Sequence, residues 1–315
     1  MRKLDRKLIR DLSQLKGQAI AIVLVIAAGI GVFVMSMCAY SSLKNGQNEF
    51  YREFRFADVF SSCRRCPKTM ASRIEEIPGV STVETRLVFD VLLQVPEMVE
   101  PATAKLISIP DSGESRLNQV YISRGRMLEP GKTGEVVVSE MFAEAHEFVP
   151  GDKVRAIING KLQELTIVGI ALCPEFVIQI QGGSMLPDKK RYGIFWMNER
   201  DLESAFDMVG AFNSVSLKLT HNANTADVIA RLDHLLDSYG SVGAYDRSDN
   251  ISHTFVNDEL AQLKTMATFA PAIFLAVAAF LLNIVVSRII TRQREQIAAL
   301  KAFGYTNLEV GMHYL

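Results

Sequence analysis

The sequence predicts an α+β domain held between two transmembrane α-helices, and two observations carry this prediction. The first is a pair of apolar runs, 17–40 and 266–286, that contain no charged residue. The second is a β-α-β pattern at 56–95 that returns at 212–247, beyond a stretch rich in predicted strands. Two such halves, far apart in sequence, favour one ferredoxin-like unit that is split by an insertion.

The two apolar runs are long enough to cross a bilayer. As helices, the 24 residues of 17–40 span about 36 Å and the 21 residues of 266–286 about 31 Å, against a hydrocarbon core of about 30 Å. The first run exceeds the apolar region of a secretory signal, and no cleavage site follows it. Both runs are therefore predicted to be membrane helices.

Charge predicts the orientation of these helices. Residues 1–16 carry six basic and two acidic side chains, and residues 287–315 carry four basic and two acidic ones. The segment 41–265 carries 24 basic and 31 acidic residues, a net charge of −7. Basic flanks stay in the cytoplasm, so 41–265 is predicted to be extracytoplasmic. The formal net charge of −1 for the whole chain argues against a nucleic-acid-binding protein.

Before the first span, Leu4, Leu8, Leu12 and Leu15 form one helical stripe with basic residues largely off it. This pattern indicates an amphipathic helix at 1–16 on the inner membrane surface, or a simple extension of the membrane helix. Within the span, Ala27 and Gly31 have the small-xxx-small spacing that allows another helix to approach closely.

The predicted extracytoplasmic segment repeats one order of elements, strand, helix and strand, at its two ends. A strand at 56–62, a helix at 67–77, a turn at Pro78 and Gly79 and a strand at 80–95 make the first half. A strand at 212–219, a helix at 225–240 and a short strand at 241–247 make the second. The insertion, 97–205, is predicted to be mostly β, with a hairpin turning at Asn159 and Gly160. A helix at 253–265 then runs into the second span.

After the second span the helical pattern continues to Gly304, which is suited to end a helix. Thr306 and Glu309 fit a capping box that starts another helix. Because this helix has barely begun at Leu315, the sequence is expected to be a fragment or a truncated chain.

The residues offer little chemistry. The stretch 125–133 has five residues between its glycines where a phosphate-binding P-loop needs four, and a strand is predicted after it. Cys63 and Cys66 are placed between a strand and a helix, where a local disulfide is favoured over a redox centre. The five histidines show no metal-ligand spacing. We therefore predict no catalytic residue, metal or cofactor.

Three stretches give the sequence a family resemblance. They are FADVF with RIEEIPGVSTVETR, then SRGRMLEPGKTGEVVVSEMFAEAHEFVPGDKV, and finally TRQREQIAALKAFGY after the second span. The chain thereby resembles FtsX-like permeases, in particular the branch with a MacB-type periplasmic core domain, which are membrane subunits of ABC transporters. The resemblance covers nearly the whole chain, but helices three and four of the family are absent from it.

The resemblance implies that a separate cytoplasmic ATPase binds the ATP and drives export or extraction of an amphiphilic or peptide-like substrate. It places ATPase coupling at 294–304, on Arg294, Glu295, Ile297, Leu300, Lys301 and Gly304. It further implies a multi-pass protein of the bacterial inner membrane, in contact with lipid. A dimer or pseudo-dimer of permease halves and a periplasmic adaptor are the other partners implied.

A two-span sensor is the alternative function. Two membrane helices around an extracytoplasmic ligand-binding domain suit a sensor, but no kinase, cyclase or methyl-accepting module is found in 287–315. An outward-facing thiol oxidoreductase would depend on Cys63 and Cys66 alone.

Overall fold

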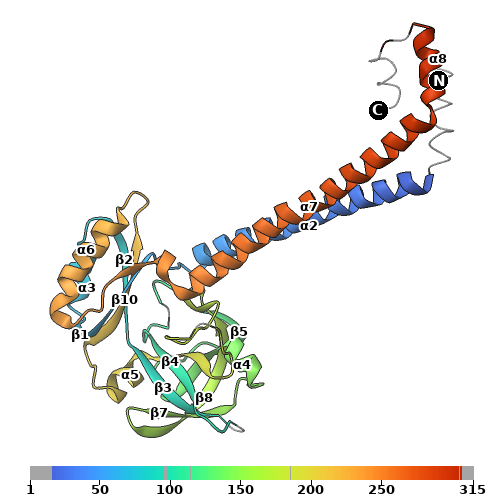
Figure 1. Cartoon of the computed structure of the whole chain (residues 1–315). Coiled ribbons are helices and arrows are strands. Elements are labelled where there is room, and N and C mark those ends of the chain that lie inside the picture. The colour runs from blue at the N-terminus through green and yellow to red at the C-terminus, as the bar shows by residue number, and fades with distance from the viewer. Residues whose placement is uncertain (1–15, 96–97, 114, 185, 305, 307–315) are drawn as a thin grey trace. The chain divides into compact units, whose positions relative to one another are not determined.

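The structure is a computed structural model that describes residues 16–95, 98–113, 115–184, 186–304 and 306 (Figure 1). The chain divides into two compact units. We call residues 1–45 with 259–315 the helical unit, and Gly46–Asp258 the sheet domain. The amphipathic helix predicted at 1–16 lies outside the described residues apart from Lys16, and so does Glu309 of the predicted capping box.

Two long helices correspond to the predicted spans. Helix α2 (Lys16–Glu53) and helix α7 (Ile251–Arg292) contain windows of mean hydropathy 2.7 and 2.5, and both are long and apolar enough to cross a membrane. Within the helical unit the close approach is at Gly29, where an added Cβ would lie 2.9 Å from Cβ of Phe274. Nothing in this chain lies within 4 Å of a Cβ built on Gly31, so the predicted Ala27 and Gly31 pair does not make this contact, and approach of another helix to it stays a prediction.

The first and last parts of the sheet domain form one four-stranded sheet. Its strands lie in the order β11-β1-β10-β2, and neighbouring strands are antiparallel. This is the order of a ferredoxin-like fold, so the predicted split unit is confirmed. Helices α3 and α6 pack side by side on one face of the sheet (Figure 1). The elements are β1 (Val59–Pro67), α3 (Met70–Glu75), β2 (Val80–Arg86), β10 (Ala211–Leu219), α6 (Thr225–Leu236) and β11 (Tyr245–Asp246).

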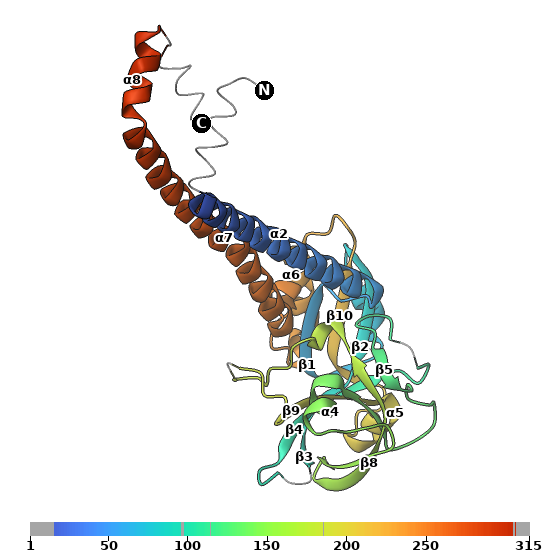
Figure 2. The ribbon, with the colours of Figure 1, turned by 90° about the vertical axis from the view of Figure 1, so that its right-hand side faces the viewer.

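The insertion forms a closed barrel. Seven strands lie in the order β5-β8-β6-β9-β4-β3-β7, and β7 also pairs with β8, which closes six of them into a ring. Figure 2 shows helices α4 and α5 beside these strands. The elements are β3 (Val88–Gln94), β4 (Ala102–Ile109), β5 (Tyr121–Gly125), β6 (Glu135–Ser139), α4 (Glu140–Ala145), β7 (Lys153–Ile158), β8 (Lys161–Leu172), β9 (Tyr192–Asn198) and α5 (Glu199–Ala205), with three 3-10 helices, Pro174–Phe176, Asp237–Tyr239 and Arg247–Asp249.

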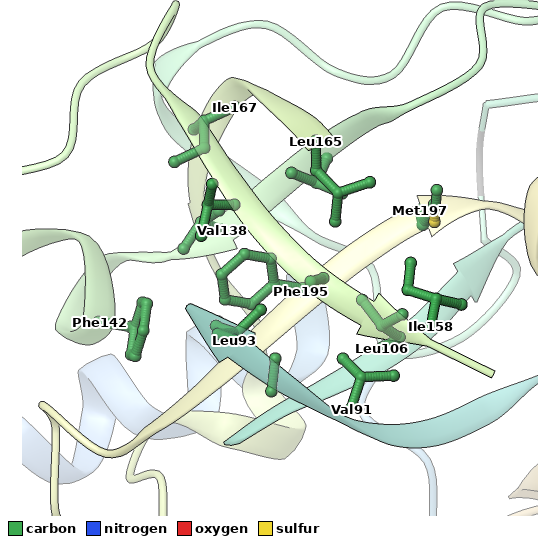
Figure 3. Close-up of a cluster of buried hydrophobic side chains, with 14 of the residues drawn as sticks. Val91, Leu93, Leu106, Val138, Phe142, Ile158, Leu165, Ile167, Phe195 and Met197 are labelled. Carbon is green, nitrogen blue, oxygen red and sulfur yellow. The ribbon is translucent and has the colours of Figure 1, made fainter. Parts of the chain in front are cut away.

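Alternate residues of the barrel strands fill its interior, as expected for the two-residue period of a strand. Figure 3 shows Phe195 and Met197 of β9 pointing into one cluster with Leu106 and Val138. The intervening residues of β9, including Trp196, belong to a second cluster on the other side of the strand. Strand β9 is therefore buried on both faces and lacks a polar alternation.

The structure corrects three predicted boundaries. The strand predicted at 80–95 is two strands, because β2 joins the four-stranded sheet and β3 joins the barrel. The insertion therefore begins at Val88 and not at residue 97. The last strand of the ferredoxin-like unit is only Tyr245–Asp246. The hairpin turn is confirmed at Asn159 and Gly160, whose φ angles of 46° and 76° suit a type I′ turn.

Candidate functional site

The end of α2 inside the sheet domain is fixed by a Schellman motif. The backbone N–H of Phe56 donates to the carbonyl of Tyr51 at 2.9 Å, and the N–H of Arg55 donates to that of Arg52 at 3.3 Å. Arg55 occupies the left-handed position of this motif, with φ of 50°. The apolar contact that accompanies the motif is made by two rings, since the centroids of Tyr51 and Phe56 lie 4.6 Å apart. This geometry turns the chain from the helix into β1.

Phe56 is the centre of a buried cluster at this turn. Its side chain is 0% exposed, and its ring also lies 5.9 Å from that of Phe60 and 6.1 Å from that of His253. Tyr51 is nearly as buried, and burial raises the pKa of its hydroxyl. Aromatic rings in contact add to the stabilisation that comes from burial alone. The cluster therefore fixes the chain where α2 enters the sheet domain.

Arg247, just before α7, clamps the same turn from the other end of the domain. Its guanidinium donates to the carbonyls of Phe56 at 2.9 Å and of Ala57 at 2.8 Å, and it pairs with the carboxylate of Asp58. The guanidinium carbon lies 4.7 Å from the ring centroid of Phe56, in range for a cation–π interaction. Lys218 reaches the same carboxylate at 3.2 Å, and partial burial, together with the charge of Arg247, lowers the pKa of its amine.

The first turns of α7 add a chain of polar contacts. Nδ1 of His253 lies 3.2 Å from the hydroxyl of Tyr51, and Nε2 lies 2.7 Å from the amide nitrogen of Asn257. Gln47 donates to the hydroxyl of Tyr51 and to the amide oxygen of Asn257, both at 3.3 Å. These bonds are consistent with each other when Nδ1 of His253 carries the proton. They join Gly46–Glu53 of α2 to the beginning of α7.

We call this group the junction cluster. Its members come from residues 47–58 and 247–257, which are the two places where the sheet domain continues into α2 and α7. The cluster consists of Gln47, Tyr51, Phe56, Asp58, Arg247, His253 and Asn257. Its hydrogen bonds are made to partners within the protein, and no group of three His, Cys, Asp or Glu residues suited to a metal occurs in the described ranges. The cluster therefore joins the end of α2, the start of β1 and the first turns of α7 within the sheet domain.

The two cysteines lie inside β1, and the predicted place between a strand and a helix is wrong. Ser62 pairs with Ser214 but Cys66 pairs with Phe212, so β1 has two extra residues here and bulges. The bulge turns both sulfurs into the core of the four-stranded sheet, although residues three apart in a regular strand face opposite ways. Both thiols are free in this structure, and their pairing as a disulfide stays a prediction.

The predicted coupling residues lie on or beside α8 (Arg294–Ala302), which follows a break at Gln293. Gly304 follows its end with φ of 92°, as predicted for a residue that stops a helix. Arg294, Glu295 and Lys301 are exposed, and Ile297 is half-buried. The sequence analysis did not single out Phe303, whose side chain is 83% exposed.

Comparison with known families agrees with this architecture. The model of a MacB-like periplasmic core domain matches residues 19–235, and the model of an FtsX-like permease C-terminal region matches residues 268–315. The chain belongs to the MacB-type FtsX-like permeases. It therefore belongs to a family of ABC transporter permeases that carry a periplasmic domain, and the resemblance seen in the sequence is confirmed.

Two solved structures are similar to part of the chain. The periplasmic region of MacB from Actinobacillus actinomycetemcomitans is 14% identical, with a TM-score of 0.39, covering 67% of this chain and 98% of that one. The extracellular domain of the noncanonic ABC-type transporter YknZ from Gram-positive bacteria is 15% identical, with a TM-score of 0.37, covering 60% of this chain and 98% of that one. No protein of curated function matches the chain.

Sequence reasoning missed the junction cluster. The FADVF stretch marked residues 56–60 as part of the family pattern, but nothing local indicates that Arg247 or His253 meets it. The contacts join residues that are 189 and more positions apart. Only the ferredoxin-like topology, which places the ends of the domain on neighbouring strands, could have suggested them.

Proposed function

We propose that the chain is the permease subunit of an ABC transporter of the MacB/Lol/FtsX type. In this proposal it couples ATP hydrolysis by a separate ATPase subunit to motion of the sheet domain, for export or extraction of an amphiphilic or peptide-like substrate. The observation that carries the proposal is the order of the two family matches in one chain, a MacB-like periplasmic core domain followed by an FtsX-like permease region. The two-span sensor gains no support from that order.

In this proposal the energy enters through a contact with the ATPase subunit, since the P-loop-like stretch 125–133 lacks the spacing that binds ATP. We assign this contact to α8 and the residues that follow it, with Arg294, Glu295, Ile297, Leu300, Lys301 and Gly304 as the coupling residues. Exposed Phe303 is added as an apolar anchor, since apolar side chains surrounded by charges contribute most of the affinity of a docking surface. At 3.6 residues per turn, Ile297 and Leu300 lie on one side of α8 and Glu295 on the other.

Motion of α8 would then reach the periplasmic domain along α7 and α2. Each is one helix whose apolar stretch continues into turns that belong to the sheet domain. The junction cluster joins those turns to β1 within the sheet domain. We infer that the cluster makes the sheet domain follow the helices.

The same proposal sets location and partners. We place the protein in the bacterial inner membrane as a multi-pass subunit with its N-terminus in the cytoplasm, on the charge pattern of the flanking segments. A reporter that is active only outside the cytoplasm should work when fused near Gly160 and fail when fused after Gly304, and the opposite result would reverse this orientation. A second permease half and a periplasmic adaptor are the further partners of the proposal.

Single substitutions on α8 test the coupling contact. In the full-length permease, Leu300→Asp should abolish co-purification with the ATPase and the stimulation of ATP hydrolysis, because a buried charge at an apolar anchor is poorly tolerated. Glu295→Arg changes the charge on the other side of the helix. A loss of co-purification in this variant would indicate that this side contacts the ATPase as well. The matched control is Ala298→Asp, an equal added charge at an exposed position.

Membrane insertion and the protease resistance of the sheet domain should be unchanged in all three variants. If Leu300→Asp still co-purifies with the ATPase and supports transport, the assignment of α8 as the coupling contact is wrong.

A further inference from the structure

A cavity of about 410 Å³ lies in the sheet domain, between the four-stranded sheet and the barrel. Its volume lies in the range of pockets that hold small molecules, about 300–1,000 Å³. Strands β1 and β11 supply Phe60 and Tyr245, Tyr192 comes from β9 of the barrel, and Asn250 precedes α7. A ligand in this cavity would therefore contact both the four-stranded sheet and the barrel.

The charged groups of this cavity are already paired. Arg86 holds the carboxylate of Glu175 at 2.6 Å, and Lys105 holds that of Asp90 at 3.0 Å. Of the residues that the structure describes, Arg86, Glu175 and Lys105 are the charged ones that line the cavity. A charged ligand would lose its water here without meeting a free counter-charge, which is costly. The cavity therefore favours an uncharged ligand.

Two buried neutral side chains of the cavity wall have polar groups without a partner. Tyr192 is 4% exposed, and its hydroxyl makes no hydrogen bond to any described residue. Asn250 is 7% exposed, and its side-chain oxygen accepts from the backbone N–H of His253 at 3.0 Å, which leaves its amide nitrogen unpartnered in the described ranges. The unpartnered side-chain atoms that are sealed from water in those ranges belong to Gln18 and Arg86, so the groups of Tyr192 and Asn250 are open to the cavity. Buried polar groups nearly always have a partner, which favours a ligand that supplies one.

Two further neutral groups line the same cavity. The hydroxyls of Tyr245 and Ser62 also make no hydrogen bond within the described part of the chain. Burial raises the pKa of the Tyr192 and Tyr245 hydroxyls, so both are protonated near neutral pH and can donate. Together with Asn250, these groups come from β9, β11, β1 and the turn before α7. They suit a ligand that carries polar groups in several directions.

Aromatic rings supply the apolar part of the wall. Phe60 and Tyr245 are stacked, with ring centroids 5.5 Å apart and an angle of 21° between their planes. Tyr245 is 38% exposed, so part of its ring is free to be covered. Phe176 lines the same cavity and is half-buried. A flat ligand with C–H groups on its faces would remove this aromatic surface from water.

From these observations we infer that the cavity binds a neutral sugar. A pyranose ring has hydroxyls around its rim, which both donate and accept, and C–H bonds on its faces. The rim meets the groups of Tyr192, Asn250, Tyr245 and Ser62, while one face covers the aromatic rings. A molecule with a single polar end would leave most of these groups without a partner. The inference depends on the sheet domain alone and goes beyond the proposed coupling to an ATPase.

Saturation-transfer NMR on the full-length chain in nanodiscs of zwitterionic lipid tests this site. The probes are the methyl β-glycosides of glucose, galactose, mannose and N-acetylglucosamine, with empty nanodiscs as the blank. We expect transfer to at least one of these sugars, bound about tenfold or more tightly than the uronate and the amino sugar with the same ring, because the cavity has no free counter-charge. Absence of transfer to all of them, as for a cavity that holds only water, or equal binding of the charged sugars, would overturn the inference.

Paired variants test whether the sugar binds in the cavity. Tyr192→Phe keeps the ring and removes the hydroxyl, and should weaken binding about fivefold, while Tyr121→Phe, at a 47% exposed position on β5, should leave it unchanged. Asn250→Asp keeps the side-chain oxygen that caps α7 but exchanges the amide donor for a charge, and should weaken binding about tenfold or more. Asn224→Asp makes the same change at the cap of α6, away from the cavity, and should have no effect.

Equal losses in the cavity variants and their controls would contradict the site. Leu300→Asp on α8 should bind the sugar normally, so a failure of the coupling proposal and a failure of this one give different results.

Discussion

The two regions that we assign to force transmission are opposite in construction. The coupling segment after α7 is contiguous in sequence, since helix α8, its charged residues and the helix stop at Gly304 all lie within 294–304. Its aromatic side chain, Phe303, is 83% exposed. The junction cluster is assembled from residues about two hundred positions apart, and its central side chain, Phe56, is 0% exposed. One has the character of a surface that docks a partner, and the other that of a core.

This difference predicts how each region responds to change. A docking surface loses binding when an anchor is removed and keeps its fold, because the anchor is solvated in the free protein. A core loses stability when an anchor is removed, since a cavity is left behind. Paired substitutions of the same residue type in the two regions therefore test whether the assignment is right.

The largest effect is expected for Phe56→Ala, compared with Phe303→Ala. Loss of the fully buried ring should lower the unfolding free energy of the sheet domain by about 3–5 kcal/mol. Loss of the exposed ring should change it by less than about 0.5 kcal/mol while weakening co-purification with the ATPase. Chemical denaturation of the full-length chain in nanodiscs, followed by the fluorescence of Trp196, measures the first quantity, because this is the single tryptophan and is 3% exposed.

Equal losses of stability in the two variants would mean that Phe303 is packed in the free protein, and the contrast between the two regions would fail. A Phe56→Ala variant as stable as the parent would remove the junction cluster from the core.

The features of the fold that depend on short stretches of sequence could be predicted from the sequence. Uncharged length identified the two long helices, and the repeated β-α-β pattern with its turns identified the ferredoxin-like unit. The path of the chain through 80–95 could not be predicted in this way, because this strand-like stretch contains no glycine or proline to show that the chain leaves one sheet for another at Leu87. The bulge at Cys63 was missed for a similar reason, since the register of β1 is set by β10, which is far away in the sequence.

The site was predicted even more unevenly. The segment around α8 could be proposed because its family pattern is contiguous, and Gly304 was recognised as a helix stop by residue type. The junction cluster could not, because Tyr51, Arg247 and His253 have no distinguishing neighbours and owe their role to topology. The unpartnered groups of Tyr192 and Asn250 are likewise a property of packing that no spacing reveals.

A smaller effect is expected for the cysteines, which lie in the sheet domain but outside the junction cluster. Burial raises the pKa of Cys63 to about 12 and that of Cys66 to about 11, so both thiols are neutral near pH 8. In the folded, reduced protein we expect them to resist alkylation by iodoacetamide. Replacing both with serine should cost at most about 3 kcal/mol, for burying two hydroxyls, and should leave transport intact.

The pH dependence of stability gives these thiols a second test. Because the folded-state pKa values lie above the ordinary value of 9.0, the stabilisation from neutral thiols is complete below that pH and is lost as the pH rises through about 9 to 12. The double serine variant has no such groups, so it should lose less stability over this range than the reduced parent. A transport defect in a stably folded double variant would instead favour a redox function. If Cys63 and Cys66 form the local disulfide that we propose, the mass of the parent protein before reduction should be lower by two hydrogens than after reduction.

The smallest effect is expected at Arg55, which ends α2 beside the junction cluster. Its φ of 50° places a side chain in the left-handed region, which costs a non-glycine residue about 1–2 kcal/mol. Arg55→Gly should therefore raise the unfolding free energy by about 0.5–1 kcal/mol, because relief of this strain outweighs the extra freedom that glycine has in the unfolded chain. Arg52→Gly is the matched control, since the same replacement inside the last turn of α2 should lower stability by about 1 kcal/mol. Opposite signs for these neighbouring substitutions would support the Schellman motif as the end of α2, whereas a loss of stability in both would mean that Arg55 contributes a contact larger than its strain.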